Sequence, residues 1–371
     1  MTKAAELAKM GEVLTNSQIG RKNIAINGAM QISQRSASAT GVGATDNVYP
    51  ALDRYAVSIG AASAGRFTMS QSAVTDLNGF SNALKIDCTT ADTSVAAGEA
   101  LMIQHRIEGL SCQQIKASST STNAYTISFY AKSNASRAIV LESKHTEGTN
   151  QQISSLHTIG TSWARYTMTV PASSSTEIDN DNTTGITISF WIHAGTTYTG
   201  GTLNTASLAA TTQANRAAGI GSIFASTDNT LEITGLQLEV GSQATPFEHR
   251  SYGEELALCQ RYYTVIADGA IASGFCPIAV GVIYNSSTVY CTIELPREMR
   301  TSPSIEIVDA TNYYQLYSND TADPVNDFTL SKVGTSRVEF YNSSDVSRVA
   351  GHATFIRTAN ASAKFALTAE L

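Results

Sequence analysis

Hydrophobic and polar residues alternate along most of the chain after Asn23, and this period of two predicts β-strands. Such runs lie at residues 84–88, 101–107, 125–131, 164–170, 186–192 and 236–240, and again at 287–295, 304–309, 337–341 and 350–357. One apolar and one polar face are typical of antiparallel strands with one side on a core. Many short strands separated by turns rich in Ser, Thr, Asn and Gly predict an all-β fold, a jelly-roll β-sandwich.

Two segments break this alternation with helical spacing. Leu7, Met10 and Leu14 recur at intervals of three and four residues, which places them on one stripe of a short helix. A helix this short is marginal alone, so we expect its stripe to contact the body of the protein or copies of itself. After a turn-forming stretch ending at Pro246, Leu256 and Tyr263 fall on one face of a second predicted helix.

These changes of period predict four parts of the chain. They are an N-terminal helical attachment or oligomerisation segment at 1–22, a jelly roll at 23–245, a linker helix at 246–266, and a smaller C-terminal β domain at 267–371. The linker helix joins two β domains, so we expect Leu256 and Tyr263 to contribute an axial contact between subunits.

Charge and apolar content exclude several classes of partner. The chain has 24 Lys and Arg against 31 Asp and Glu, a net charge of −7, and the basic residues are scattered. This distribution argues against nucleic acid or anionic lipid as the main partner. The apolar runs are shorter than the ~18 residues that a membrane span needs. No signal-peptide pattern follows Met1, so we expect synthesis in a cytoplasm.

The sequence offers little for catalysis or for metal binding. Five cysteines without a CxxC pair favour neither a disulfide framework nor a zinc site, and the six histidines lack metal-ligand spacing. A glycosidase would need two carboxylates ~5–9.5 Å apart. The available acids are Asp53, Glu99, Glu108, Glu142, Glu232 and Glu239, and the sequence pairs none of them. We therefore predict no catalytic residues, no cofactor and no enzymatic activity.

Aromatic side chains on the polar faces of strands are sharper candidates for sugar binding. Rings offer flat apolar surface, and neighbouring polar groups give orientation. The candidates are Trp191, His193 and Tyr130 in the predicted sandwich, and Tyr313, Tyr314 and Tyr317 beside a polar loop in the C-terminal domain. Each has two open interpretations: a platform for a glycan, or packing within the protein or at a subunit contact.

Two stretches together resemble a known family. The first is Asn-Ile-Ala-Ile-Asn-Gly-Ala-Met-Gln-Ile-Ser-Gln-Arg at 23–35, followed by Leu-Asp-Arg-Tyr at 52–55; the second is residues 236–263, ending in Gln-Arg-Tyr-Tyr. Residues 104–109 and 125–132 also fit. These segments resemble tail-fibre and other virion-attached proteins of bacteriophages, whose central domain is similar to a carbohydrate-binding-module jelly roll. The resemblance covers roughly residues 1–265.

The resemblance implies a phage virion fibre: a tail fibre or receptor-binding protein that attaches to the host cell surface, through glycan, without catalysis. It implies a homotrimer whose N-terminus binds other tail or capsid proteins. We then expect the host to be contacted by the far domain, residues 267–371. Similar modules often hold a structural calcium, but Gln31 and Gln237 stand where such modules tend to carry acids, so calcium is not supported. Two alternatives stay open: a purely structural virion protein (adaptor, head fibre or decoration), and a glycan depolymerase.

Overall fold

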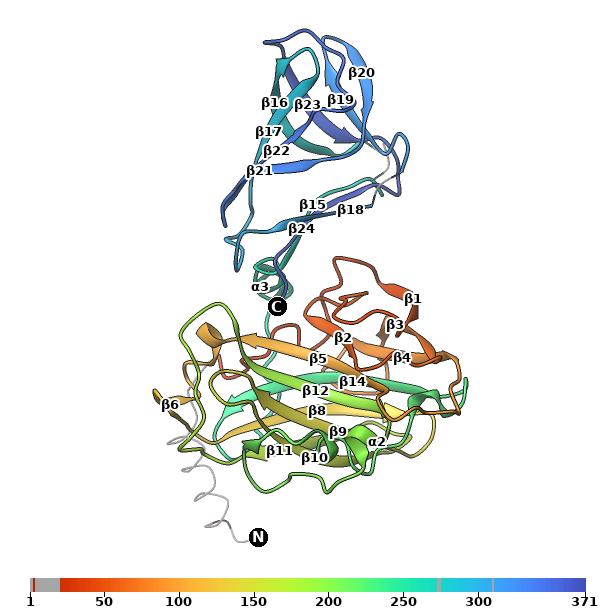
Figure 1. The fold of residues 1–371 in the computed structure, drawn as a ribbon, viewed down its shortest axis with the longest axis vertical. Coiled ribbons are helices and arrows are strands. Elements are labelled where there is room, and N and C mark those ends of the chain that lie inside the picture. Colours follow the sequence, from red (N-terminus) through yellow and green to blue (C-terminus); the bar gives the residue numbers. More distant parts are fainter. Residues whose placement is uncertain (1–2, 4–20, 272–274, 309) are drawn as a thin grey trace. The chain divides into compact units, whose positions relative to one another are not determined.

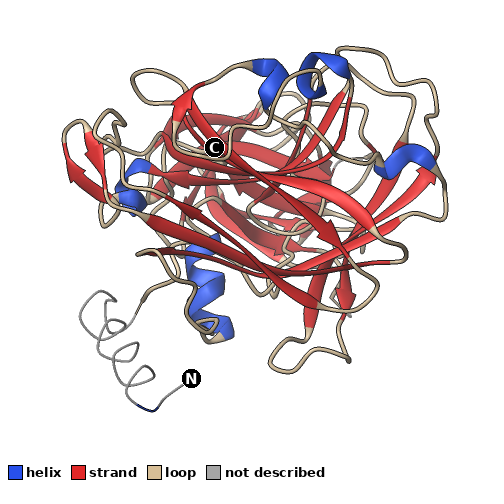
Figure 2. Ribbon diagram, turned by 90° about the horizontal axis from the view of Figure 1, so that it is seen from below, coloured by secondary structure: helices blue, strands red, loops and turns tan. Residues whose placement is uncertain are grey.

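The computed structural model describes residues 3, 21–271, 275–308 and 310–371 (Figure 1). The predicted stripe of Leu7, Met10 and Leu14 lies outside the described residues. The chain forms two compact units that divide between Glu255 and Leu256, with Leu371 assigned to the first. Antiparallel strands make up most of the regular structure in both (Figure 2). The predicted all-β fold is confirmed.

The first unit is a sandwich of two six-stranded antiparallel sheets. Sheet A has the order β1 (Ser38–Val42), β3 (Arg66–Ala73), β4 (Asn82–Thr90), β14 (Thr230–Val240), β8 (Tyr125–Ser133), β11 (Ala164–Val170). Sheet B has the order β13 (Ala209–Ala210), β10 (Gln151–Ile159), β9 (Arg137–His145), β12 (Thr184–Ala194), β5 (Ala100–Glu108), β2 (Tyr55–Ile59). A small hairpin joins β6 (Lys116–Ser118) to β7 (Ser121–Thr122). Neighbouring strands come from distant parts of the sequence, as a jelly roll requires.

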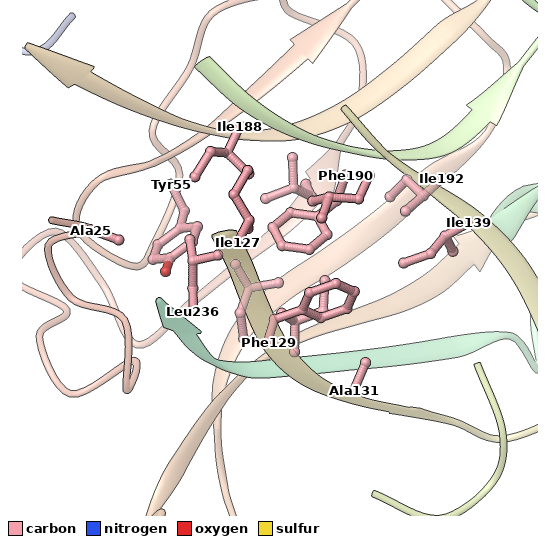
Figure 3. Packing of buried hydrophobic residues seen from close by; sticks show 14 of the residues in the cluster. Ala25, Tyr55, Ile127, Phe129, Ala131, Ile139, Ile188, Phe190, Ile192 and Leu236 are labelled. Carbon is pink, nitrogen blue, oxygen red and sulfur yellow. The ribbon is translucent and has the colours of Figure 1, made fainter. Parts of the chain in front are cut away.

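Alternate side chains of the two sheets meet in the core between them. Figure 3 shows Phe129 from β8 beside Phe190 from β12, and their ring centroids are 5.0 Å apart with the rings perpendicular. Ile188 and Ile192 flank Phe190 on the same face of β12 and are fully buried. The alternation in this strand therefore predicted its core-facing side chains correctly.

The opposite face of β12 is closed as well. Residues 195–221, which include α2 (Thr196–Thr199) and the 3₁₀ turn η2 (Gln213–Asn215), pack over part of the outer face of sheet B. A small apolar cluster forms beneath them, made of Ala100, Met102, Val140, Trp191 and Ala217. The strand thus buries residues on both of its faces, which its polar/apolar alternation does not predict. Two further 3₁₀ turns, η1 (Gly109–Cys112) and η3 (Ile223–Ala225), complete the unit.

The stretch 23–35, which carries the family resemblance, acts as a buried brace. Asn23 Oδ1 accepts hydrogen bonds from the backbone N of Ala25 (3.0 Å) and of Leu238 in β14 (3.1 Å). Asn27 has φ +59°, and its side chain bonds both the N and the O of Ile32, at 2.9 and 2.8 Å. Short polar side chains tolerate this left-handed conformation and can cap it locally. The motif therefore fixes the fold of the first unit.

Gly28 in this brace is required by space. A Cβ there would lie 2.1 Å from the backbone O of Leu236, while Leu236 N donates to Gly28 O at 2.9 Å. We expect Gly28→Ala to lower the free energy of unfolding of the first unit by about 1–3 kcal/mol, because the added methyl separates two bonded segments. Urea titration followed by tryptophan fluorescence measures this change. Gly253→Ala is the control, since nothing lies within 4 Å of that position, and it should be neutral or slightly stabilising.

The second unit contains two antiparallel sheets around a core of its own. The smaller sheet has the order β15 (Tyr263–Asp268), β24 (Lys364–Thr368), β18 (Ser304–Val308). The larger has the order β20 (Thr321–Val325), β19 (Tyr314–Ser318), β23 (Ala353–Thr358), β16 (Pro277–Asn285), β17 (Thr288–Glu294), β22 (Arg337–Asn342), β21 (Thr329–Val333). Phe340 and Phe365 meet in its core with ring centroids 5.3 Å apart. The expected smaller C-terminal β domain is present.

The helix near the boundary is shorter than predicted. Helix α3 (Tyr252–Cys259) replaces the linker helix expected over 246–266. The segment before it is held extended, because Glu239 accepts hydrogen bonds from Thr245 and Gln237 accepts one from Glu248 N. Leu256 is half-buried on the helix, whereas Tyr263 is buried at the start of β15. The predicted common helical face of these two residues is therefore not formed.

The helices and the cysteines bear on two of the expectations drawn from the sequence. None of the helices in the described residues is long and apolar enough to cross a membrane. All five cysteines are free thiols, four of them buried and Cys276 partly exposed. Burial raises the pKa of the Cys291 thiol to about 12, which is typical of an inert side chain in a core.

Candidate functional site

An open groove lies on the outer face of sheet B, beside the segment that covers Trp191. Its volume is about 400 Å³. Four adjacent strands, β2, β5, β12 and β9, form its floor. Its lining residues are Ser58, Ile59, Gly60, Met102, Gln104, Arg106, Lys144, Thr146, Thr184, Thr187, Tyr198 and Arg216. Hydroxyl, amide and cationic groups dominate this set.

The strand register arranges the floor in three cross-strand rows. From the open to the covered part they are Arg106–Thr187–Lys144, Gln104–Ser189–Glu142, and Met102–Trp191–Val140. Side chains directly opposite each other on neighbouring strands have Cβ atoms ~5 Å apart. The groove therefore passes from a hydrophilic row, through a buried polar row, to an apolar row beneath residues 195–221.

The two basic residues of the open row have different surroundings. Arg106 donates to Gln104 Oε1 at 2.8 Å from Nη2, and also reaches the main-chain oxygen of Leu371 at 2.6 Å. Lys144 is half-buried, and among the described residues its Nζ has no hydrogen bond or ion pair. Desolvation and the neighbouring Arg216 lower the pKa of Lys144, while Glu142 partly opposes them. Lys144 is thus a partly desolvated cation facing the groove.

The middle row contains a buried ion pair. Glu142 is fully buried, and Arg216 holds both of its oxygens, Nε to Oε1 and Nη2 to Oε2, each at 2.7 Å. The indole N–H of Trp191 donates to Oε2 at 3.0 Å, and the Arg216 guanidinium lies 4.6 Å from the centroid of the Trp191 ring. Two matched hydrogen bonds and a stacked ring fix Arg216 as one wall of the groove.

The structure gives Trp191 and His193 packing roles. Trp191 is fully buried and contacts Tyr198 with ring centroids 5.2 Å apart. His193 is also fully buried; its Nε2 lies 3.1 Å from Glu99 Oε2 and its Nδ1 lies 2.8 Å from Ser222 Oγ. Neither ring is accessible to a sugar in this conformation. Of this group only Tyr198, which the sequence did not single out, is half-exposed and lines the groove.

Tyr130 lies on the other sheet, away from the groove. Its half-buried ring packs against Phe80 with centroids 5.2 Å apart, and the Arg165 guanidinium lies 5.8 Å from its centre. Together with Trp163, whose indole N–H donates to Asp76 at 2.8 Å, it belongs to a satellite cluster on the outer face of sheet A. The groove residues and Tyr130 are therefore not brought together.

The three tyrosines of the second unit point in different directions. Tyr314 is fully buried, and its hydroxyl oxygen lies 2.7 Å from the backbone oxygens of both Val308 and Lys364, to one of which it donates. Tyr313 is half-buried against the same core. Tyr317 lies on the outer face, where Arg357 stacks 4.7 Å from its ring centroid. Tyr317 alone of the three keeps an outward-facing ring.

The described residues offer no cluster for a metal ion, and the groove offers no carboxylate. No group of three or more His, Cys, Asp or Glu side chains is placed there to hold a metal ion. The lining of the groove contains no Asp or Glu. Two carboxylates border it. Glu142 is paired with Arg216, and Asp46 Oδ1 accepts hydrogen bonds from Ser58 Oγ and Ile59 N at the rim.

Known structures similar to this chain include carbohydrate-binding modules and a phage tailspike domain. No family model and no curated protein matches the sequence. A CBM4 structure is similar over 58% of this chain and 98% of its own, with 13% identity and a TM-score of 0.29. A family 11 carbohydrate-binding module from Clostridium thermocellum, in complex with a β-1,3-1,4-mixed-linked tetrasaccharide, is similar over 58% and 99%, with 11% identity and a TM-score of 0.28.

The tailspike domain is much longer than the part of it that this chain matches. The enzymatically active domain of bacteriophage CBA120 tailspike protein 4 is similar over 59% of this chain, with 12% identity and a TM-score of 0.29. The chain matches 21% of the length of that domain.

Proposed function

We propose that the first unit binds a carbohydrate in the groove on the outer face of sheet B. The observation that carries this proposal is the open row of hydrogen-bonding side chains across three strands, next to the half-exposed ring of Tyr198. Sugar hydroxyls need several fixed polar partners, and a sugar ring needs a nearby apolar wall. Gln104 and Thr187 supply neutral hydrogen-bonding groups, and Tyr198 with Met102 supplies the wall.

Binding without catalysis is part of the proposal. Glycoside hydrolysis by the usual route needs two carboxyl groups on either side of the scissile bond. The lining residues supply none, and Glu142 beneath them is enclosed and bonded to Arg216. Release of reducing sugar from a polysaccharide that the protein binds would favour the depolymerase alternative instead.

We further propose that the chain is a subunit of a homotrimeric phage virion fibre. The support is the sequence resemblance in 23–35 and 236–263, together with apolar side chains left exposed on one strand of the second unit. Val280, Val282 and Tyr284 alternate along β16 with 73%, 44% and 68% of their surface exposed. Covering such a row by a second copy would remove apolar area from water.

The oligomeric state tests the trimer directly. We expect three copies by light scattering of the full chain at micromolar concentration, and a shift to lower mass on Val280→Lys. A monomeric wild-type protein would contradict the trimer and leave the groove proposal standing.

A glycan microarray probed with the full chain tests carbohydrate binding. Tyr198→Ala should weaken binding by about tenfold or more, because it removes the exposed aromatic wall. Tyr252→Ala is the matched control, since that tyrosine is 60% exposed and lies outside the groove, and its variant should bind as wild type. Equal binding by wild type and Tyr198→Ala would place the site elsewhere, for example at Tyr317 in the second unit.

A further inference from the structure

We propose that the groove selects acidic saccharides, those bearing a carboxylate such as uronic-acid units, over neutral ones. This inference rests on the proposed function of the same groove and adds the class of ligand. It starts from the charges that the strand register places together.

The groove is positively charged in a chain of net charge −7. Its lining includes Arg106, Lys144 and Arg216 and no acidic residue. Glu142 offsets Arg216, because the two groups form a bidentate pair. Lys144 remains unpaired among the described residues, whereas Arg106, two strands away and about 10 Å distant, donates to an oxygen of Leu371, the last residue of the chain. Asp46 stands at the rim, where the backbone of Ile59 and the hydroxyl of Ser58 already engage it.

Lys144 is the groove cation without a charged partner among the described residues. It sits in the open row next to Thr187, half-buried, with no hydrogen bond or ion pair to any residue that the structure describes. Burying part of a cation costs free energy unless an opposite charge compensates it. Its neighbour Glu142 gives both oxygens to Arg216, so a direct ion pair at Lys144 is left for a ligand to make.

The geometry also limits what the ligand looks like. Lys144 and Thr187 are directly opposite each other on β9 and β12, so a sugar whose carboxylate binds Lys144 would have a hydroxyl within reach of Thr187. Arg106, at the far end of the row, donates to the amide oxygens of Gln104 and Asn47 and to an oxygen of Leu371, the last residue of the chain, so Lys144 is the cation left for a ligand. Such a row suits an extended saccharide with one acidic unit at β9 and its neighbours directed toward β5.

Matched glycan pairs test this inference. The probes are uronic-acid oligosaccharides of several linkages, each beside its carboxyl-reduced, neutral counterpart, titrated against the full chain by calorimetry at 50 and 300 mM NaCl. We expect the acidic member to bind at least tenfold more tightly, and its advantage to shrink in high salt. Lys144→Gln should remove about tenfold of the affinity for acidic probes and little for neutral ones, whereas Lys144→Arg should retain most of it.

Lys85→Gln is the matched control. Lys85 lies on β4 in the other sheet and pairs with Asp87 at 3.0 Å, so its loss should leave all affinities unchanged. Equal affinity for both members of each pair, or unchanged acidic binding in Lys144→Gln, would overturn the acidic preference while carbohydrate binding stands. Binding of no probe by wild type would overturn both proposals.

Discussion

Replacing Arg216 with methionine should lower the free energy of unfolding of the first unit by about 3–5 kcal/mol. Glu142 is fully buried, and Arg216 supplies two of the three hydrogen bonds that it receives. Without the guanidinium, the carboxylate keeps only the N–H of Trp191. A buried charge with one neutral donor is strongly destabilising, so the protein either takes up a proton at Glu142 or opens residues 195–221 to water.

The two tryptophans make this measurement specific to one unit. Trp163 and Trp191 are the only tryptophans in the chain, and both belong to the first unit. Urea titration followed by their fluorescence therefore reports the stability of the sandwich, whatever the second unit does. The double variant Glu142→Gln with Arg216→Met should recover much of the loss, since it leaves no unpaired charge.

Lys85→Met supplies the comparison with an exposed pair. Lys85 and Asp87 keep 31% and 41% of their side-chain surface exposed, so breaking that pair should cost well under about 1 kcal/mol. A loss below about 1 kcal/mol in Arg216→Met would show that Glu142 is accessible to water, contrary to the structure.

The strands were predictable because their signal is local. In β12, Ile188, Phe190 and Ile192 alternate with polar residues, and this pattern alone names the side that meets the core. What covers the other side was not predictable. Trp191 is buried by residues 195–221, a stretch rich in Thr, Ala and Gly that has no periodicity of its own, and His193 contacts Ser222 and Phe224 just after it. The sequence therefore identified Trp191 as outward-facing from the core without indicating that the loop encloses it.

The end of helix α3 shows the limit of helical spacing. Leu256, Cys259 and Tyr263 have the separation of a helical face, yet the helix ends at Cys259. Tyr263 instead pairs with Thr368, more than a hundred residues later. Aromatic and β-branched residues such as Val265 favour strands when a partner strand is present. The decisive pairing is long-range, so a local pattern could not separate the two outcomes.

Predicting the groove from the sequence would have required the same kind of long-range information. Arg106, Thr187 and Lys144 lie on three strands that are far apart in sequence, and each is an unremarkable polar residue in its own strand. Only the register across β5, β12 and β9 makes them neighbours. A signal was nonetheless present in the odd placement of Lys144, a cation within the otherwise buried run of β9. A correct prediction that β9 pairs with β12 would have placed Lys144 opposite Thr187 and so identified it as a groove residue.

Acidification from pH 7.5 to pH 5 should destabilise the first unit by about 4 kcal/mol, mainly through two buried histidines. Burial lowers the pKa of His105 to about 3, helped by the nearby Arg54, and burial lowers the pKa of His145 to about 4. In the unfolded chain both have a pKa near 6.5. Between these values the unfolded state binds more protons, so stability falls as the pH falls below about 6.5. Each histidine contributes roughly 2 kcal/mol over the 1.5 units from pH 6.5 to pH 5.

Both rings are placed to resist protonation. His105 Nε2 lies 2.7 Å from the backbone O of Ile26, and His145 Nε2 lies 2.7 Å from the Tyr125 hydroxyl. Among the described residues neither ring is hydrogen-bonded to a carboxylate, so an added charge would stay uncompensated in the core. Urea midpoints by tryptophan fluorescence at pH 7.5, 6.5, 5.5 and 5.0 measure the effect. His145→Gln should be less stable at pH 7.5 and should lose about half of the pH dependence, because one proton-binding group is gone from the unfolded chain.

His249→Gln is the control that removes a histidine outside the core. His249 is exposed on the first unit, so its removal should leave the pH dependence as in wild type. The measurement stays above pH 5 because carboxylates with lowered pKa values, such as Asp92 beside Ser63, add their own acid sensitivity below that range. Stability that is flat between pH 7.5 and 5 would mean that these rings are reached by water and take up protons in the folded state. An undiminished slope in both His145→Gln and His105→Gln would mean that other groups cause the pH dependence.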